Sequence, residues 1–140
     1  MASLTVGIAA ALEQFHPNEI LEHAALAEKH GFSGQMAADH VQPWVPAQGE
    51  AAFVWNVLSA LGMNTTGDIG PGVTCPSMRW HPSMVAQASA TLAAMFPGRH
   101  WLGLGSGEAL NEHITGQYWP EAPERINRMF EAIEIIQKLF

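Results

Sequence analysis

The chain has 140 residues, of which 48% are hydrophobic and 14% are charged, so it is not a disordered chain and can bury a core of its own. Six Lys and Arg residues against thirteen Asp and Glu residues give a formal net charge of −7. This acidic balance argues against partners that need clustered basic residues, so we expect neither nucleic acid nor a membrane as a partner.

Cysteine and histidine usage narrows the class of protein further. The single cysteine, Cys75, permits no internal disulfide and no zinc site built on paired cysteines, which favours a reducing compartment. None of the seven histidines forms an H-E-x-x-H or H-x-H motif, so no metal site is expected. The N-terminus lacks a basic signal-peptide region, and no apolar run reaches about 18 residues. We therefore expect a cytoplasmic protein whose residues 1–140 form a single domain.

The first half of the chain contains two cycles of a strand pattern followed by a helix pattern. The apolar run at residues 4–10 predicts a buried strand. Pro17 suits the first position of the next helix, and Gly31 suits its C-terminal stop. A second strand is expected at residues 32–38, and after a loop a helix is expected at residues 51–61.

Two of the predicted strands contain residues that interrupt a regular ladder. Gln35 lies in the middle of the second strand, where a buried amide should face a polar neighbour or a polar pocket. Residues 66–74 predict the third strand, but Pro71 and the two glycines that flank it interrupt the strand, which suggests a bulge or a close approach of the backbone to a ligand. The third helix is predicted to begin at Pro82 and to end at Pro97-Gly98.

The fourth cycle joins a strand pattern at residues 100–104 to a glycine-rich turn at residues 105–112. The turn lacks the G-x-G-x-x-G dinucleotide fingerprint, but such a turn can present free backbone N–H groups to an anion or a ring oxygen. An amphipathic helix is predicted at residues 124–140. Four consecutive βα cycles predict an α/β fold with a parallel sheet. Because a closed eight-stranded barrel needs roughly 250 residues, the chain is either a (βα)4 half-barrel or a small open sheet.

The end of the second predicted strand places a carboxylate and an imidazole side by side, at Asp39 and His40. Ligands and catalytic groups of α/β folds lie at the carboxyl ends of parallel strands, which favours a functional site here. In the alternative interpretation, Asp39 caps the next turn and His40 is a surface histidine. Trp44 has a similar alternative as a packing aromatic, and Glu108 as a carboxylate in the first turn of a helix.

Over essentially its whole length the chain resembles the N-terminal half of the luciferase-like flavin and deazaflavin oxidoreductases, most closely the coenzyme F420-dependent glucose-6-phosphate dehydrogenase group. The motifs that carry this resemblance are Glu13-Gln14-Phe15, Asp39-His40-x-x-Pro43-Trp44, Arg79-Trp80-His81-Pro82, Val85-Ala86-Gln87-Ala88, Phe96-Pro97-Gly98-Arg99 and the run from Gly103 to Glu112.

The resemblance implies a TIM barrel that binds F420, or FMN in a variant, and transfers a hydride from a sugar phosphate or alcohol to the cofactor. It implies that His40 is the base and that Glu108 handles the proton of the reducible ring. It also implies that Trp44 forms a wall of the substrate pocket and stabilises the charge that develops during hydride transfer. The implied cofactor contacts are Asp39, Val73, Cys75, Gly107 and Asn111. Val73 matches a cis non-prolyl position, Cys75 stands where relatives often have threonine, and Glu13 resembles a carboxylate of the substrate pocket.

In the family, the groups that hold the substrate phosphate and much of the cofactor tail belong to the second half of the barrel. A (βα)4 chain leaves open edges at its first and fourth strands, and such edges pair readily with other strands. We therefore expect a homodimer that joins these edges and completes an eight-stranded barrel. The alternative is a non-catalytic half-barrel scaffold, natural or engineered, that self-associates without turnover.

Overall fold

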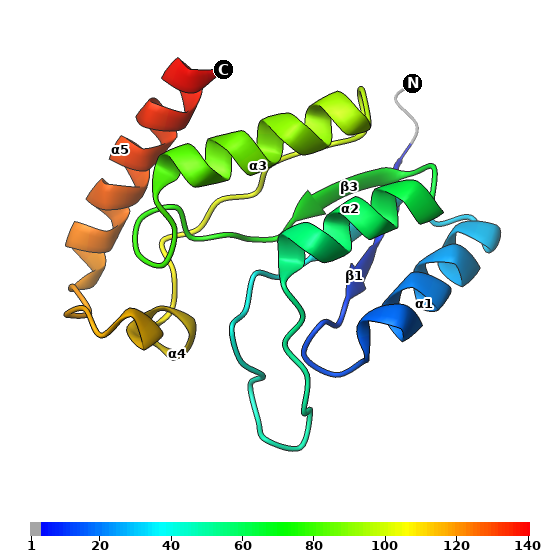
Figure 1. Cartoon of the computed structure of the whole chain (residues 1–140), viewed down its shortest axis with the longest axis horizontal. Helices are drawn as coiled ribbons and strands as arrows, with labels where there is room; N and C mark the ends of the chain where they lie inside the picture. Colours follow the sequence, from blue (N-terminus) through cyan, green and yellow to red (C-terminus); the bar gives the residue numbers. More distant parts are fainter. Residues whose placement is uncertain (1–3) are drawn as a thin grey trace.

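Three short parallel strands form the sheet of the computed structural model, which describes residues 4–140 (Figure 1). They are β1 (Ile8–Ala10), β2 (Gly34–Ala37) and β3 (Asp68–Pro71), in the order β1-β2-β3. The parallel register confirms the predicted α/β class and brings the carboxyl ends of the strands to the same edge. Residues 1–3 of the predicted domain lie outside the described residues.

The predicted fourth strand is wrong as a regular strand. Residues 100–104 run beside β3 but form only two isolated bridges, from His100 to Ile69 and from Leu104 to Thr74. Pro71 has no N–H to donate between these bridges, and the Trp101 ring lies against the backbone of Gly70, where a Cβ would approach it within 2.4 Å. The ladder is therefore interrupted where β3 ends, and the segment that follows it can turn away from the sheet.

Three helices cover the sheet and enclose the core. α1 (Pro17–Lys29) packs on β1 and on α2 (Val54–Asn64), which also contacts β2, β3 and α3 (Pro82–Met95). Pro17 begins α1 as predicted, and Gly31 follows its end with a left-handed φ of 95°. Helix α2 begins later than predicted, with Phe53 as its N-cap. The largest fully buried core side chains include Leu12, Ile20, Leu58, Leu61, Ile69, Val85 and Leu92.

The C-terminal part consists of the short α4 (Ala109–Glu112), the 3-10 turn η1 (His113–Thr115) and the long α5 (Ala122–Leu139). Helix α5 packs mainly along α3, at the side of the molecule (Figure 1). It buries Ala132 and Ile136, whereas Phe130 stays exposed. Between residues 4 and 140, no helix is both long and apolar enough to cross a membrane.

One polar residue is buried in the sheet without the partner that its position requires. Gln35 is 2% exposed, and within the described part of the chain its Oε1 accepts no hydrogen bond. This oxygen has no hydrogen-bonding neighbour among residues 4–140, but Gln35 lines a second pocket, of about 410 Å³, beside β1 and β2, which is the other surrounding expected for it.

Candidate active site

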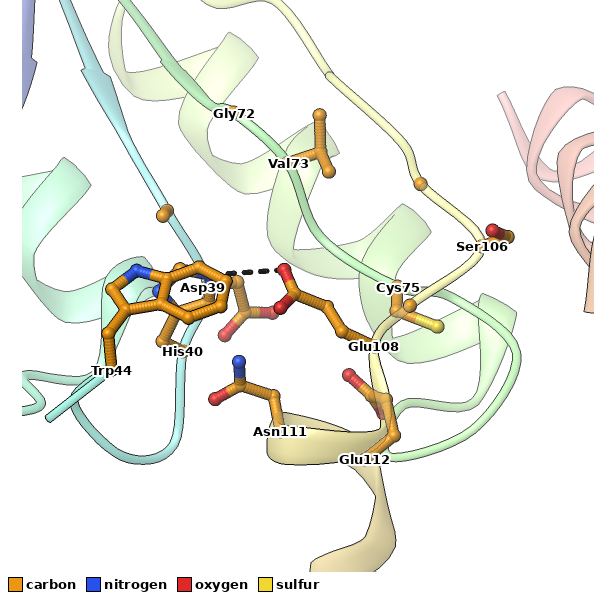
Figure 2. Close-up of a pocket in the computed structure, with 13 residues that line it drawn as sticks. Asp39, His40, Trp44, Gly72, Val73, Cys75, Ser106, Glu108, Asn111 and Glu112 are labelled. Carbon is orange, nitrogen blue, oxygen red and sulfur yellow. Dashed lines mark ion pairs between the residues drawn. The ribbon is translucent and has the colours of Figure 1, made fainter. Parts of the chain in front are cut away.

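A pocket of about 360 Å³ lies at the carboxyl ends of β2 and β3 (Figure 2). One wall is the end of β2 and the loop after it, and the opposite wall is the glycine-rich segment that leads into α4. The segment that follows β3 lies between them. The lining residues are Ala38, Asp39, His40, Trp44, Gly72, Val73, Cys75, Gly105, Ser106, Gly107, Glu108, Asn111 and Glu112.

His40 lies between two carboxylates. Its Nδ1 contacts Oε1 of Glu13, which follows β1 and is 6% exposed, and its Nε2 lies 3.6 Å from Oε1 of Glu108. The Trp44 indole meets the imidazole edge to face, with the ring centroids 4.8 Å apart and an interplanar angle of 83°. Because a carboxylate only accepts hydrogen bonds, Glu13 fixes a proton on Nδ1 and leaves Nε2 directed toward the pocket. The arrangement can accept a proton at Nε2 and stabilise the imidazolium that results.

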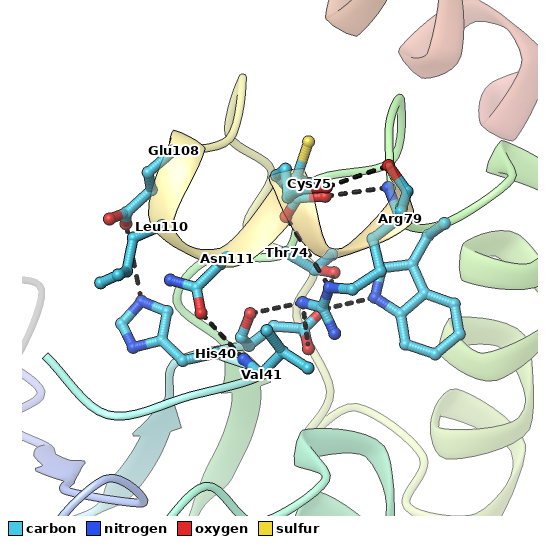
Figure 3. A network of polar contacts seen from close by, with 12 residues as sticks. His40, Val41, Thr74, Cys75, Arg79, Glu108, Leu110 and Asn111 are labelled. Atoms are coloured by element: carbon cyan, nitrogen blue, oxygen red, sulfur yellow. Dashed lines mark hydrogen bonds and ion pairs between the residues drawn. The ribbon is translucent and has the colours of Figure 1, made fainter. Parts of the chain in front are cut away.

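Asp39 is a buried acceptor shared by several donors. Its Oδ2 accepts hydrogen bonds from the Trp80 indole N–H at 2.7 Å and from the Thr74 hydroxyl, and its Oδ1 lies 3.0 Å from Nη2 of Arg79 (Figure 3). The carboxylate is therefore held by protein groups from the segment after β3. Asp39 therefore does more than cap the following turn. Its carboxylate joins the end of β2 to the segment after β3 at the edge of the pocket.

Helix α4 is tied to the loop after β2. Oδ1 of Asn111 accepts a hydrogen bond from the Val41 backbone N–H at 2.8 Å, and the Gln42 side-chain amide donates to the Leu110 carbonyl at 2.8 Å. Among residues 4–140 the buried Nδ2 of Asn111 donates to no acceptor, although the residue lines the pocket. Glu112 accepts the Arg79 backbone N–H at 2.8 Å, and burial raises the pKa of its carboxyl while Arg79 opposes that rise.

The floor of the pocket is apolar and close-fitting. The expected cis peptide is present between Gly72 and Val73, and the Val73 side chain, 49% exposed, lies beside Gly105 and lines the pocket. Gly107 adopts a φ of 79°, and a Cβ there would lie 2.8 Å from Sγ of Cys75. Only glycine fits both conditions. Burial raises the pKa of the Cys75 thiol, which makes it a packing group rather than a reactive thiolate.

The structure brings nearly all the predicted site residues to this pocket. Glu13 is the exception, because it lies behind His40 and outside the lining. Sequence reasoning assigned no role to Thr74, Arg79, Trp80 or Glu112, although Arg79 and Trp80 stood together in a motif of a chain with only six basic residues. In the part of the chain that the structure describes, no three His, Cys, Asp or Glu side chains gather as a metal site.

A parallel βα chain with its pocket at the carboxyl ends of the strands has the architecture of part of a TIM-barrel enzyme. The family described as luciferase-like monooxygenase matches residues 2–140, and the chain belongs to this family. The resemblance inferred from the motifs is thereby confirmed.

Relatives of the chain include enzymes that are named as dependent on coenzyme F420. The F420-dependent glucose-6-phosphate dehydrogenase of Microbacterium testaceum is 49% identical over 138 residues, which are 98% of this chain and 41% of the relative. The F420-dependent hydroxymycolic acid dehydrogenase of Mycobacterium tuberculosis is 44% identical over 140 residues, 99% of this chain and 39% of the relative. The solved F420-dependent secondary alcohol dehydrogenase in complex with an F420-acetone adduct superposes with a TM-score of 0.92 and 38% identity, over 95% of this chain and 41% of that one. The chain thus spans about two fifths of these relatives.

Proposed function

We propose that the chain carries the base and part of the cofactor site of an F420-dependent dehydrogenase, which oxidises an alcohol such as glucose 6-phosphate or a secondary alcohol. The observation that carries this proposal is the His40 imidazole, which the buried Glu13 holds at Nδ1 and which directs Nε2 into the pocket, 3.6 Å from Glu108. The F420-dependent relatives support the cofactor.

Alcohol oxidation requires the hydroxyl proton and a hydride from the carbon to leave together, which yields a carbonyl or a lactone. Nε2 of His40 accepts the proton, and Glu13 stabilises the imidazolium that forms. Trp44 covers one side of the imidazole and forms the wall beside the reacting carbon. Glu108 holds a proton for the reducible ring. When bound, F420 supplies the hydride acceptor.

The residues of the pocket fit a deazaflavin. Nδ2 of Asn111 is a buried donor that has no acceptor within residues 4–140, and it can bind an oxygen of the cofactor. Val73 offers an apolar surface for a ring, and the absence of a Cβ at Gly107 leaves room for the backbone to approach it. We assign Asp39 and Cys75 as further contacts, and FMN is the alternative cofactor of the same pocket.

We also propose that two copies of the chain complete a barrel. Among the described residues, neither the outer edge of β1 nor that of residues 100–104 pairs with a further strand. Apolar side chains on the strands stay exposed, with Met36 and Trp101 both at 38%. Sedimentation at micromolar concentration should give the mass of a dimer, and a stable monomer would contradict this pairing.

Titration with F420 and FMN under tryptophan fluorescence tests the cofactor proposal. Because Trp44 lines the pocket, F420 should quench the wild type, and Trp44→Phe should lose most of the quenching. Trp119→Phe is the matched control, since Trp119 packs on Arg125 and does not line the pocket. If neither cofactor quenches, the proposal fails. Quenching without reduction by glucose 6-phosphate or 2-propanol would favour a non-catalytic scaffold.

A further inference from the structure

Arg79 contacts both walls of the pocket. Its guanidinium Nη2 donates to the Asp39 carbonyl at 2.6 Å and lies 3.0 Å from Oδ1 of the same residue. Its backbone N–H donates to Oε2 of Glu112 at 2.8 Å, and its Nε lies 3.8 Å from Oε1 (Figure 3). Asp39 directly precedes His40, and Glu112 ends α4. One residue therefore links the strand end that carries the base to the helical turn that follows Glu108.

Arg79 is also the cation between two buried anions. Asp39 is 4% exposed and Glu112 is 2% exposed, and a buried carboxylate is costly unless a cation or hydrogen bonds compensate its charge. Burial, and to a smaller extent the Asp39 and Glu108 charges, raise the pKa of Glu112, and Arg79 opposes the rise. Glu108 and the Cys75 thiol are the other titratable groups that act on Glu112 or feel its charge. Without Arg79, the carboxylate of Asp39 on one wall and that of Glu112 on the other would repel each other.

We infer that Arg79 is a positioning residue that sets the spacing between His40 on one wall of the pocket and Glu108 on the other. The bond from the Val41 N–H to Asn111 spans the same gap and depends on the same spacing. The inference rests on the proposed function, because Asn111 and Glu108 are the groups that meet the cofactor. Arg79 itself lines no part of the pocket and acts through its neighbours.

The first test measures the dissociation constant for F420 in Arg79→Met and in the wild type, from ~pH 5.5 to ~pH 8. At the upper end the variant should bind about tenfold more weakly, because the unpaired carboxylates repel each other. As the pH falls, the Glu112 carboxyl, whose pKa is raised by burial, becomes protonated, the repulsion ends, and the ratio of the variant constant to the wild-type constant should fall. Arg79→Lys keeps the cation and the backbone N–H bond to Glu112 but loses the guanidinium fork that contacts Asp39 at two oxygens, so it should bind with intermediate affinity at a ratio that does not vary with pH.

Arg99→Met is the matched control. Arg99 is also half-buried and donates to the carbonyls of Gly62, Thr65 and Gly67, away from the pocket. Its replacement should lower stability without changing the F420 dissociation constant. A loss of affinity in this control equal to that of Arg79→Met, with no pH dependence in either, would reduce the role of Arg79 to general stability and overturn the inference.

A second test needs no cofactor. Amide hydrogen exchange at Val41 reports its bond to Asn111, and it should be about tenfold faster in Arg79→Met than in Arg99→Met. If wild-type protein does not bind F420, the proposed function fails, and this exchange rate alone decides the positioning role. If Arg79→Met does not fold, Arg79→Lys takes its place in the exchange test, where exchange at Val41 should still be faster than in Arg99→Met. Unchanged exchange together with an unchanged dissociation constant overturns the inference.

Discussion

Replacing Asp39 with asparagine should destabilise the protein strongly, because it removes the charge at a buried junction. The carboxylate accepts from Trp80 at 2.7 Å and from Thr74, and it pairs with Arg79 at 3.0 Å. An asparagine keeps one acceptor oxygen but turns its NH2 toward one of these donors. Arg79 is then left half-buried without one of its two counter-charges.

The magnitude follows from the burial of the pair. Removing one partner of a buried ion pair costs about 3–5 kcal/mol, and the remaining acceptor oxygen of asparagine places this case near the lower end. With about 2.1 cal/mol/K of unfolding entropy per residue, 140 residues give about 290 cal/mol/K. A loss of about 3 kcal/mol therefore lowers Tm by about 10 °C.

Thermal unfolding followed by circular dichroism measures this change, with urea unfolding as a second measurement. Asp68→Asn is the matched control, because Asp68 is exposed at the start of β3, and it should alter the free energy of unfolding by less than about 0.5 kcal/mol. A Tm of Asp39→Asn within about 2 °C of the wild type would refute the reasoning.

Three further predictions concern other parts of the molecule. Glu13→Gln keeps an acceptor for Nδ1 of His40 but removes the charge, and kcat/KM for alcohol oxidation should fall by about tenfold or more; an unchanged value would exclude a role for the charge. Gly107→Ala should lower the free energy of unfolding by about 1–3 kcal/mol in urea, because φ is 79° and the new Cβ would lie 2.8 Å from a thiol sulfur. Hydrogen bonds from the Thr66 backbone N–H and hydroxyl hold the pKa of Glu28 below its usual value, so its contribution to stability is present above the unfolded pKa and lost as the pH falls through the folded pKa. Glu28→Gln should therefore reduce the acid dependence of Tm, and an unaltered acid dependence would contradict this assignment.

Helix positions could be predicted well from the sequence because their signals are local. Pro17, Gly31 and Pro82 mark helix ends through their own backbone restrictions, and all three lie where the patterns placed them. The fourth strand failed for a reason that is not local. Its pattern was apolar, but the neighbouring strand ends at Pro71, which cannot continue the ladder.

The residues that line the site could be predicted mainly from the family motifs, whereas the contacts among them could not. Nothing in the chain links Glu13 to His40 in advance, because 27 residues separate them and only the parallel pairing of β1 with β2 brings their strand ends together. The role of Arg79 could not be predicted from the sequence for a related reason. Its importance comes from two acids on different elements, and neither lies near it in sequence.

The hydrogen bonds between the two walls of the pocket also have a consequence for folding. They join residues 70 and 68 positions apart, so the pocket forms only after a long segment of chain has been closed, at a cost in chain entropy that α1 or α2 does not incur. Regions that close such long loops with few contacts tend to open first. A ligand that contacts both walls would therefore hold the two ends of this long loop together, and the Tm of the protein should rise with ligand concentration. The pocket would then contribute to the folding of the chain as well as to its chemistry.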